Sequence, residues 1–396
     1  MNIFKSRSLW LLWLSHLFMD FFTGIWPIYK TLANIDVAKA GLIAGISGFI
    51  GEIFQLAFGY LSDHGYRKKV LILGLILAST IMWITFVDGI LPSFFVLLLL
   101  MLGSGSFHPA AVGMAGNLAG EKKSSAILFY ASGGAIGLGI SQLVFTKFRE
   151  IFGGHAIIIL VPLMAVLFIL MLHNFPRQIY AKRNLSFRGF FEPIMHCRKA
   201  LSLLYLSQVA VQGLVLSFTF LLPDILRMRS CHSWFCMGGG HLCFVLGSAI
   251  TMVPAGWLCD RFGQKKVLLT VVALASILFY VFLTNPPPTI GGTVLLLGSL
   301  GSVLGIINPI IVSWGSRLVP ESPSTVSAIL MGFAWCFSNL GPTCAGFLTK
   351  FYNEDPYLNA IGSLGALLFL VFFFVFFMPR PAPAPVAVKA VNEEIT

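Results

Sequence analysis

Long hydrophobic stretches recur along the whole chain, and short polar or charged segments separate them. Each stretch is close to the roughly 20 apolar residues that a helix needs to cross a lipid bilayer. The pattern therefore predicts membrane-spanning helices rather than the alternating pattern of a half-buried sheet. We place twelve of them at approximately 8–30, 39–62, 69–88, 91–117, 124–147, 155–174, 200–226, 236–259, 266–284, 290–316, 323–350 and 357–378.

The predicted helices fall into two groups of six, because a basic stretch interrupts them after the sixth. We predict an all-α membrane protein of twelve transmembrane helices in two pseudo-symmetric six-helix bundles. The Pro- and Ala-rich C-terminal segment is typical of a disordered or polyproline-like extension. The predicted units are an N-terminal bundle at 1–174, a basic cytoplasmic connector at 175–199, a C-terminal bundle at 200–378 and a disordered cytoplasmic tail at 379–396.

The composition excludes an ordinary soluble protein. Hydrophobic residues make up 57% of the chain and charged residues 10%, whereas globular domains contain about 25% charged residues. The net charge of +11 does not indicate a nucleic-acid partner, because apolar stretches keep the basic residues apart. The chain carries no nucleophile–base triad, so we expect no enzyme activity, no cofactor and no bound metal.

The distribution of Lys and Arg predicts the orientation in the membrane. With a cytoplasmic N-terminus, 19 of the 26 basic residues fall in cytoplasmic segments and 7 in outside loops, in agreement with the positive-inside rule. The first outside loop contributes Lys30 and Lys39, and we expect no Lys or Arg deep within a predicted helix. We predict a monomeric, multi-pass protein of the cell's inner (plasma) membrane with both termini in the cytoplasm.

One charged loop occurs twice, half a chain apart. The stretch GYLSDHGYRKKV covers 59–70 and GWLCDRFGQKKV covers 256–267, an offset of 197 residues. Each copy joins the second and third predicted helices of its half, which indicates two halves of one design. The residues that we single out are Gly59, Asp63, Arg67 and Lys68 in the first copy and Gly256, Asp260, Arg261 and Lys265 in the second.

These loops resemble the signature loop of the major facilitator superfamily, G-x-x-x-D-R-x-G-R-K-x. The second copy follows it closely, whereas the first has His64 in place of the Arg, and its glycine, Gly65, comes one position early. The resemblance implies a conformational latch that holds the two halves together on the cytoplasmic side, the Asp pairing with basic residues and a helix N-terminus. The alternative is that these residues only set the membrane topology.

A narrower resemblance extends over most of the chain. The stretches SHLFMDFFTGIWP (15–27), GSGSFHPAA (103–111), ASGGAIGLG (131–139) and SAILMGFAWCFSNLGP (327–342) are similar to the fosmidomycin resistance protein branch of that superfamily. Departures are Ala135, where that branch typically has Asn, and the Ala-Val-Gly-Met run after Pro109, where Glu or Arg is typical. The branch implies export of a small organic molecule.

Ionisable side chains within the predicted helices are the clearest functional signal, because each costs roughly 2.5–3.5 kcal/mol to insert. Asp20 lies near the middle of the first helix with His16 one turn before it, and Glu52 lies near the middle of the second. Two bare carboxylates are too costly there, so either at least one is protonated or a cation lies beside them. We predict proton coupling through Asp20, His16 and Glu52; for His16 and Glu52, simple helix-packing contacts are the alternative.

Prolines mark corresponding places in the two halves. His108-Pro109 and Asn308-Pro309 are 200 residues apart, and Pro27 corresponds in the same way to Pro223. Broken helices at matching places indicate a transporter's central site, although a proline can also simply kink a helix. The residues that we expect to contact a substrate are Gln55, His108, Gln212, Asn308, Trp335 and Asn339.

Three further patterns carry weaker signals. The outer loop CHSWFCMGGGH (231–241) leaves a metal site and a disulfide between Cys231 and Cys236 both open. The glycines of GGAIGLG (133–139) recur at helical spacing, which is typical of close helix packing and not of a nucleotide-binding loop. The tryptophans expected to anchor the protein at the membrane interface are Trp26, Trp257 and Trp314.

We predict a secondary active transporter that moves a small organic molecule by alternating access of its two halves, with proton-coupled efflux as the leading hypothesis. Its partners are the substrate, protons and the lipid bilayer. The predicted fourth helix lacks an Arg, the residue best suited to bind an anion, so a neutral or cationic amphipathic substrate fits better. A proton-coupled or facilitative nutrient importer is the alternative, and a non-transporting receptor or scaffold is the hypothesis from another class. Convergence of the polar residues on a central cavity would distinguish them.

Overall fold

A computed structural model describes residues 6–118, 129–153, 197–285, 289–319 and 328–379, with 195, 287 and 326 as single residues. The predicted helix 155–174, most of the connector 175–199 and nearly all of the tail 379–396 lie outside the described residues. Within the described part every regular element is helical, and nine helices are long and apolar enough to cross a membrane.

In the N-terminal half the described helices follow the hydrophobic stretches closely. The first predicted span is a pair of helices that meet at Gly24. Residues 129–153 form the helix of the fifth predicted span, which we call the fifth helix and which is distinct from α5. The elements are α1 (Arg7–Thr23), α2 (Ile25–Leu32), α3 (Val37–Leu61), the short π-helical turn η2 (Ser62–Tyr66), α4 (Arg67–Ser79), the 3-10 helix η3 (Thr80–Phe86) and α5 (Ile90–Leu118).

The C-terminal half repeats this order. Its second and third predicted spans meet at Gly263, as the corresponding spans of the first half meet in η2. The elements are α8 (Arg198–Met228), η5 (Phe235–Gly239), α9 (Gly240–Phe262), α10 (Gln264–Thr284), α11 (Ile290–Leu318), η6 (Ala328–Phe333), α13 (Ala334–Ser338), α14 (Gly341–Leu348), η7 (Thr349–Phe351) and α15 (Pro356–Phe376).

Only one of the four predicted proline positions coincides with a helix break, because α1 and α2 meet at Gly24, three residues before Pro27. Pro109, Pro223 and Pro309 lie inside the continuous helices α5, α8 and α11, so the expectation that they break those helices is wrong. A proline removes only one intrahelical hydrogen bond, and packing on either side keeps the helix together. The clear interruptions are at Gly24, between α1 and α2, and at Asn339–Leu340, between α13 and α14.

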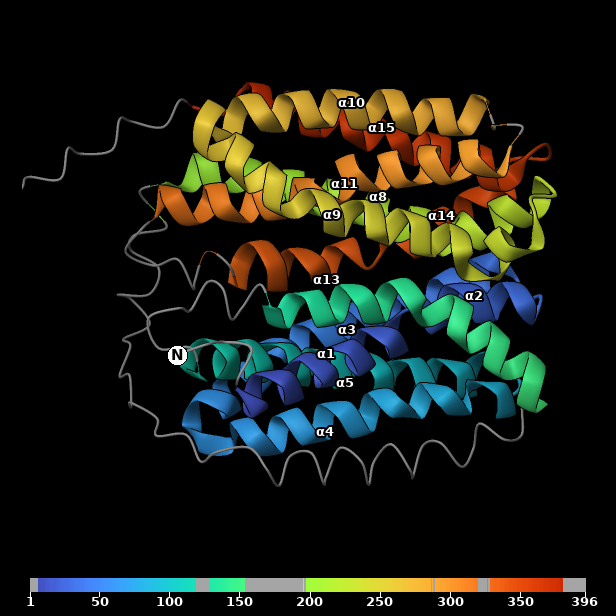
Figure 1. The fold of residues 1–396 in the computed structure, drawn as a ribbon, viewed down its shortest axis with the longest axis horizontal. Coiled ribbons are helices and arrows are strands. Elements are labelled where there is room, and N and C mark those ends of the chain that lie inside the picture. Colours follow the sequence, from blue (N-terminus) through green and yellow to red (C-terminus); the bar gives the residue numbers. More distant parts are fainter. Residues whose placement is uncertain are drawn as a thin grey trace, which may run out of the picture.

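The two halves lie one above the other in Figure 1, with α13 between them. They touch extensively at the end of the molecule that carries α2, which we call the α2 side. There the backbone of Pro342 in α14 packs so closely on Gly41 of α3 that a methyl group on Gly41 would lie 2.3 Å from the Pro342 carbonyl oxygen. Gly139 of the fifth helix likewise faces Leu242 and Val245 of α9. The described contacts therefore close the α2 side.

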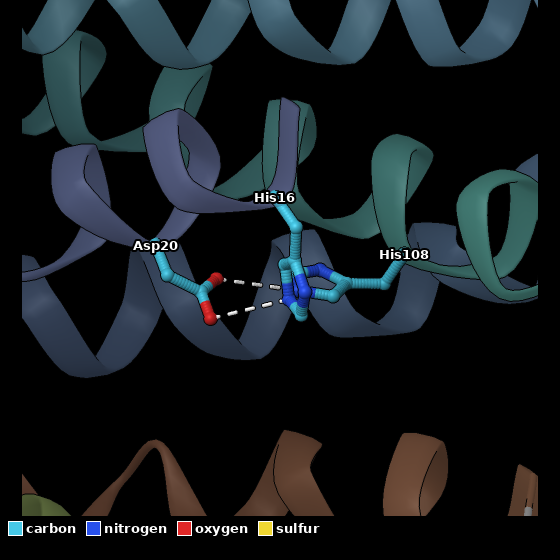
Figure 2. A group of neighbouring side chains, drawn as sticks. All are labelled: His16, Asp20 and His108. Carbon is cyan, nitrogen blue, oxygen red and sulfur yellow. Dashed lines mark ion pairs between the residues drawn. The ribbon is translucent and has the colours of Figure 1, made fainter. Parts of the chain in front are cut away.

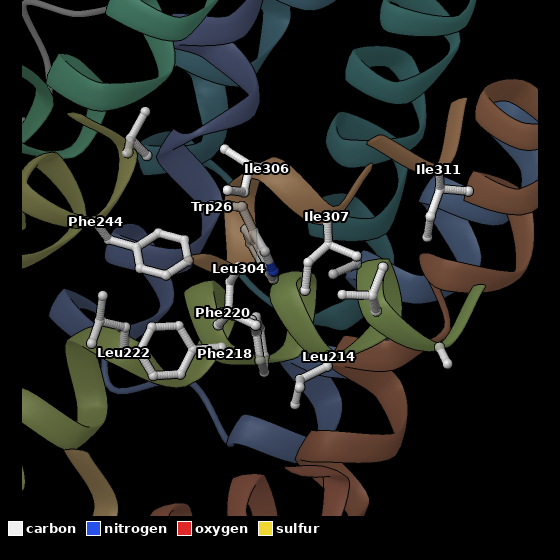
Figure 3. Close-up of a cluster of buried hydrophobic side chains, with 14 of the residues drawn as sticks. Trp26, Leu214, Phe218, Phe220, Leu222, Phe244, Leu304, Ile306, Ile307 and Ile311 are labelled. Carbon is white, nitrogen blue, oxygen red and sulfur yellow. The ribbon is translucent and has the colours of Figure 1, made fainter. Parts of the chain in front are cut away.

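A hydrophobic cluster continues from the C-terminal half into α2. Trp26 of α2 is 2% exposed and belongs to the same cluster as Phe218 and Phe220 of α8 and Leu304 of α11 (Figure 3). Its indole N–H donates to the Ala40 carbonyl at 3.2 Å. Trp26 and Trp314 are thus buried core residues, and the expectation that they anchor the protein at the membrane interface is wrong; Trp257 is exposed.

Three of the glycines of 133–139, namely Gly133, Gly134 and Gly137, pack the fifth helix directly on α1. A methyl group on Gly133 would lie 2.4 Å from the Trp13 carbonyl oxygen, and one on Gly137 would lie 2.0 Å from the Leu17 carbonyl oxygen. Backbone approaches backbone this closely only where there is no side chain. The prediction that these glycines serve helix packing is confirmed, and this close contact, which we call the glycine seam, fixes α1 beside the fifth helix.

Candidate functional site

Three ionisable side chains from two helices converge in the N-terminal half. The Nε2 atom of His16 lies 3.2 Å from one carboxylate oxygen of Asp20, and the Nε2 atom of His108 lies 3.4 Å from the other (Figure 2). His16 and Asp20 are one turn apart on α1, whereas His108 comes from α5, directly before Pro109. The structure thus joins a predicted coupling pair and a predicted substrate contact into one cluster, which we call the His–Asp–His cluster.

Both imidazole rings of the cluster are oriented by their other nitrogen. Nδ1 of His16 is 2.9 Å from the Tyr130 carbonyl oxygen, and Nδ1 of His108 is 2.9 Å from the Ser104 carbonyl oxygen. Because a carbonyl oxygen only accepts, each Nδ1 carries hydrogen and donates. His16 also stacks on the Tyr130 ring, with centroids 4.1 Å apart and planes 8° from parallel. Each ring therefore presents Nε2 to the same carboxylate.

Glu52 lies on α3 beside this cluster. It is 9% exposed, and its carboxyl lies within electrostatic range of His108 in its own half and of Cys336 in α13 of the other. Gln55, one turn further along α3, faces Gly332 of η6. A methyl group on Gly332 would lie 2.8 Å from the side-chain oxygen of Gln55. Glu52 and Gln55 therefore lie where the halves meet.

The predicted substrate contacts of the C-terminal half are more dispersed. Asn308 accepts a hydrogen bond from the buried Gln208 amide at 2.6 Å, within its own half. Asn339 packs against Gly48 of α3 and donates to the Trp335 carbonyl at 2.9 Å. Gln212 is buried on α8, and the Trp335 indole N–H is buried without a hydrogen-bond partner among the described residues. These contacts do not place the four predicted residues around one common atom.

A second charged cluster, on the α2 side, was missed by sequence reasoning. Lys30 is fully buried in α2 and forms an ion pair with Asp224 of α8. Asp224 also accepts from the Thr31 hydroxyl at 2.7 Å, and Arg227 donates to the Thr31 carbonyl at 2.9 Å. The expectation that Lys30 belongs to an outside loop is therefore wrong, because it lies in the last turn of α2 with its side chain buried.

This ion pair borders a cavity on the α2 side. The cavity has a volume of about 600 Å³, and its lining includes Lys30, Asp224, Arg227 and Lys350. None of the residues predicted to bind substrate or protons lines it. It lies on the α2 side and is therefore separate from the His–Asp–His cluster.

In the second signature loop, the described contacts stay within the C-terminal half. Asp260 pairs with Arg317 of α11, Arg261 lies over the Trp257 ring at 5.2 Å, and Lys265 donates to the Phe376 and Met378 carbonyls at 2.8 and 2.6 Å. A methyl group on Gly256 would meet no neighbouring atom within 4 Å. The contacts of Lys265 cover the C-terminal end of α15.

The first signature loop bends within η2, where Gly65 adopts a left-handed φ of 93°. Arg67 is buried and its guanidinium packs against Gly113 of α5. Gly59 faces Pro109 of α5, whereas Lys68 is half-buried and the side chain of Asp63 lies outside the described atoms. The described contacts of this loop are therefore all within the N-terminal half. Its role as a latch between the halves stays a prediction.

The cysteines of the outer loop are free thiols in the structure. The Cys236 thiol donates to the Cys231 carbonyl at 3.5 Å, and neither takes part in a disulfide. His241 is buried at the start of α9, whereas His232 is exposed. These four residues therefore do not form a metal site in this structure, and the loop packs as part of the helical core.

The family model of the Major Facilitator Superfamily matches residues 9–235 and 233–395, nearly the whole chain. The chain belongs to the major facilitator superfamily. The protein is therefore a membrane transporter and not an enzyme, as predicted. Its all-helical fold is the superfamily's arrangement of twelve helices in two bundles.

Similar proteins agree with this assignment. The chain is 24% identical over 365 residues to the uncharacterized MFS-type transporter YfnC of Bacillus subtilis (strain 168), covering 88% of this chain and 87% of that one. The crystal structure of the nucleoside transporter NupG superposes with a TM-score of 0.74 at 15% identity, covering 96% of this chain and 99% of the other. A bacterial homolog of the human lysosomal transporter Spinster, solved in an inward-facing and occupied conformation, superposes with a TM-score of 0.73 at 13% identity, covering 95% and 96%. At these identities the solved structures show the fold alone.

Proposed function

We propose that this transporter exports a small organic molecule in exchange for protons, with the His–Asp–His cluster as its proton-coupling site. The observation that carries the proposal is the shared carboxylate of Asp20, which faces one imidazole nitrogen from α1 and one from α5. A carboxylate between two imidazoles can take up and release protons without moving far, and such chains are typical proton relays in membrane transporters.

The surroundings of the cluster support its coupling role. The side chains of Asp20 and His108 are 21% and 29% exposed among the described residues, whereas the side chain of His16 is 9% exposed. Glu52 lies within electrostatic range of His108 and borders the other half. We propose Glu52 as the second coupling residue, because a change in the packing of α3 against α13 would alter its surroundings.

The closed α2 side supports a mechanism of alternating access. We place both termini in the cytoplasm, so that the α2 side faces outward, and we propose that the cluster is reached from the opposite side. We propose that rocking of the two halves opens the α2 side in turn, with the signature loops acting as the latch on the cytoplasmic side. The inner (plasma) membrane and a monomeric state belong to the same proposal.

Two observations guide the choice of substrate and direction. The resemblance to the fosmidomycin resistance protein branch supports efflux, with a proton-coupled or facilitative importer as the alternative. The Gln55, Gln212, Asn308, Trp335 and Asn339 side chains are neutral, and no Arg or Lys lies within the His–Asp–His cluster. We therefore propose a neutral or cationic amphipathic substrate rather than a phosphate-like anion.

The decisive experiment measures substrate flux in liposomes with and without an imposed pH gradient. Purified protein is screened against compound pools while the lumenal pH is recorded. Asp20→Asn mimics a permanently protonated carboxyl, so we expect exchange of substrate to continue while gradient-driven accumulation falls at least tenfold. Glu52→Gln assigns the coupled proton by the same comparison, and Glu150→Gln, at an exposed carboxyl of the fifth helix, is the matched control. If Asp20→Asn and Glu52→Gln both concentrate substrate like the parent, proton coupling through these carboxylates is wrong.

A further inference from the structure

We propose that the His–Asp–His cluster is a binding site for one divalent transition-metal ion of the Zn²⁺ class. The ion would be held by Nε2 of His16, a carboxylate oxygen of Asp20 and Nε2 of His108. This inference goes beyond the proposed function, because binding of an ion requires neither transport nor a pH gradient. Sequence analysis predicted no metal here, since His108 comes from a helix nearly ninety residues away along the chain.

The spacing of the ligand atoms fits such an ion. A tetrahedral zinc ion holds nitrogen and oxygen ligands at about 2.0–2.2 Å, which places neighbouring ligand atoms roughly 3.3–3.6 Å apart. Nε2 of His16 lies 3.2 Å from one Asp20 oxygen and Nε2 of His108 lies 3.4 Å from the other, so the carboxylate would bind the ion through both oxygens or turn to present one of them. All three ligand atoms lie within 4.8 Å of one another, and the partly exposed His108 ring has room to close the remaining distance.

The hydrogen bonds behind the rings are those of metal-ligating histidines. A histidine ligand typically donates its second ring N–H to a carbonyl or carboxylate, which fixes the tautomer and aims the free lone pair at the ion. His16 does so through the Tyr130 carbonyl and His108 through the Ser104 carbonyl, each at 2.9 Å. In neutral rings held this way, both Nε2 lone pairs face the Asp20 carboxylate. Lone pairs on all three atoms repel one another unless a proton or a metal ion lies between them.

The charges of the site also favour a divalent ion. Asp20 supplies a carboxylate to the ion, and Glu52 places a second carboxyl group within electrostatic range of His108. Imidazole and carboxylate ligands suit Zn²⁺, Co²⁺ and Ni²⁺ better than the oxygen-preferring Mg²⁺ or Ca²⁺. Three protein ligands leave at least one coordination position open. An ion bound here could therefore accept a donor atom from a transported molecule.

Metal binding to the full-length protein in detergent tests the proposal directly. Metal-free protein, purified without a histidine tag, is titrated with Zn²⁺ by calorimetry and with Co²⁺ by visible absorption. We expect one ion per chain and the absorption of a four- or five-coordinate Co²⁺ ion. Asp20→Asn, His16→Ala and His108→Ala should each weaken Zn²⁺ binding at least tenfold, and size-exclusion profiles show whether each variant is folded.

Control variants separate this site from the other possible ligands. Cys231→Ser/Cys236→Ser and His232→Ala remove the thiols and the imidazole of the outer loop and should leave Zn²⁺ binding unchanged. The proposal is overturned if the parent binds no Zn²⁺, or if binding survives in folded Asp20→Asn and His108→Ala, or if it is lost with the outer-loop residues. Loss of gradient-driven flux in Asp20→Asn without any Zn²⁺ binding by the parent would support proton coupling and reject the metal site.

Discussion

Lys30 is the single residue whose position differs most from expectation. Its ammonium group is completely buried, pairs with Asp224 of the other half and lies 4.5 Å from the centroid of the Phe220 ring. Taking two charges out of water costs several kcal/mol per ion, which the pair recovers only through close contact and further hydrogen bonds. Neither charge can therefore be removed alone without leaving the other buried and without its ionic partner.

Removing one partner should destabilise the protein far more than removing both. We expect Lys30→Met to lower the free energy of unfolding by about 3–5 kcal/mol, because the Asp224 carboxylate stays buried. Lys30→Met/Asp224→Leu should lose less than Lys30→Met alone. Chemical unfolding in detergent micelles measures both. Lys147→Met breaks the exposed pair with Glu150 and should cost less than about 1 kcal/mol. The two residues are not a coupled pair if the double substitution lowers the free energy of unfolding by the sum of the losses caused by Lys30→Met and Asp224→Leu alone.

The residue-level site could be predicted only in part from the sequence. Asp20 and His16 are one helical turn apart, so their contact follows from helix geometry. The contact of His108 with Asp20 depends on how α5 packs on α1, which no local pattern states. One feature of the sequence could have revealed the pair of Lys30 with Asp224. Asp224 falls inside the predicted helix 200–226, and an acidic residue there needs a partner at the same depth.

At the scale of helices, the glycine seam positions the candidate site. It holds α1 against the fifth helix, and a methyl group on Gly134 would lie 2.3 Å from an Asp20 carboxylate oxygen and 2.5 Å from the His16 ring. The seam therefore leaves room for both the helix contact and the two ionisable side chains. Its sequence spacing made it predictable, and Pro27 likewise marks the helix break at Gly24, whereas the break at Asn339–Leu340, directly before Gly341-Pro342, was not predicted.

A small side chain in the seam should separate the two helices. Gly137→Ala places a methyl group 2.0 Å from the Leu17 carbonyl oxygen, and we expect it to destabilise the protein by about 1–3 kcal/mol through overpacking. Gly139→Ala is the matched control, because its methyl group would lie 3.4 Å from a flexible Leu242 side chain. There the higher helix propensity of Ala should leave stability unchanged or raised. Equal unfolding midpoints in detergent for the two variants would count against a tight seam.

For the whole molecule, the two-bundle fold was predictable because it depends on the lengths and number of the apolar stretches and on the duplicated loop. How the two bundles sit against each other was not, because it depends on contacts such as Gly41 with Pro342, between residues about 300 positions apart. The predicted broken helices at Pro109 and Pro309 failed for a related reason. Tertiary packing, which a single helix's sequence does not contain, decides whether a proline interrupts a helix.

The signature loops give a test at this scale. Asp260 and Arg317 are both largely exposed, at 65% and 55% of their side-chain surface, so their pair should add less than about 1 kcal/mol to stability. We therefore expect Asp260→Asn, and Asp63→Asn in the other half, to slow turnover several-fold with unchanged unfolding and substrate affinity. Transport rates in liposomes beside binding measurements in detergent check this. Unchanged turnover in both variants would reduce the loops to topology signals.

The ion pair between Lys30 and Asp224 joins the two halves, and this has a kinetic consequence. Under the proposed rocking mechanism, each opening of the α2 side must separate the pair and hydrate both groups. Every 1.4 kcal/mol of that separation slows the step about tenfold. Separation of this pair then sets the rate at which the α2 side opens. It also sets how that rate changes with temperature. A variant that weakens the pair should visit the outward-open state more often, and transport should accelerate until another step becomes limiting.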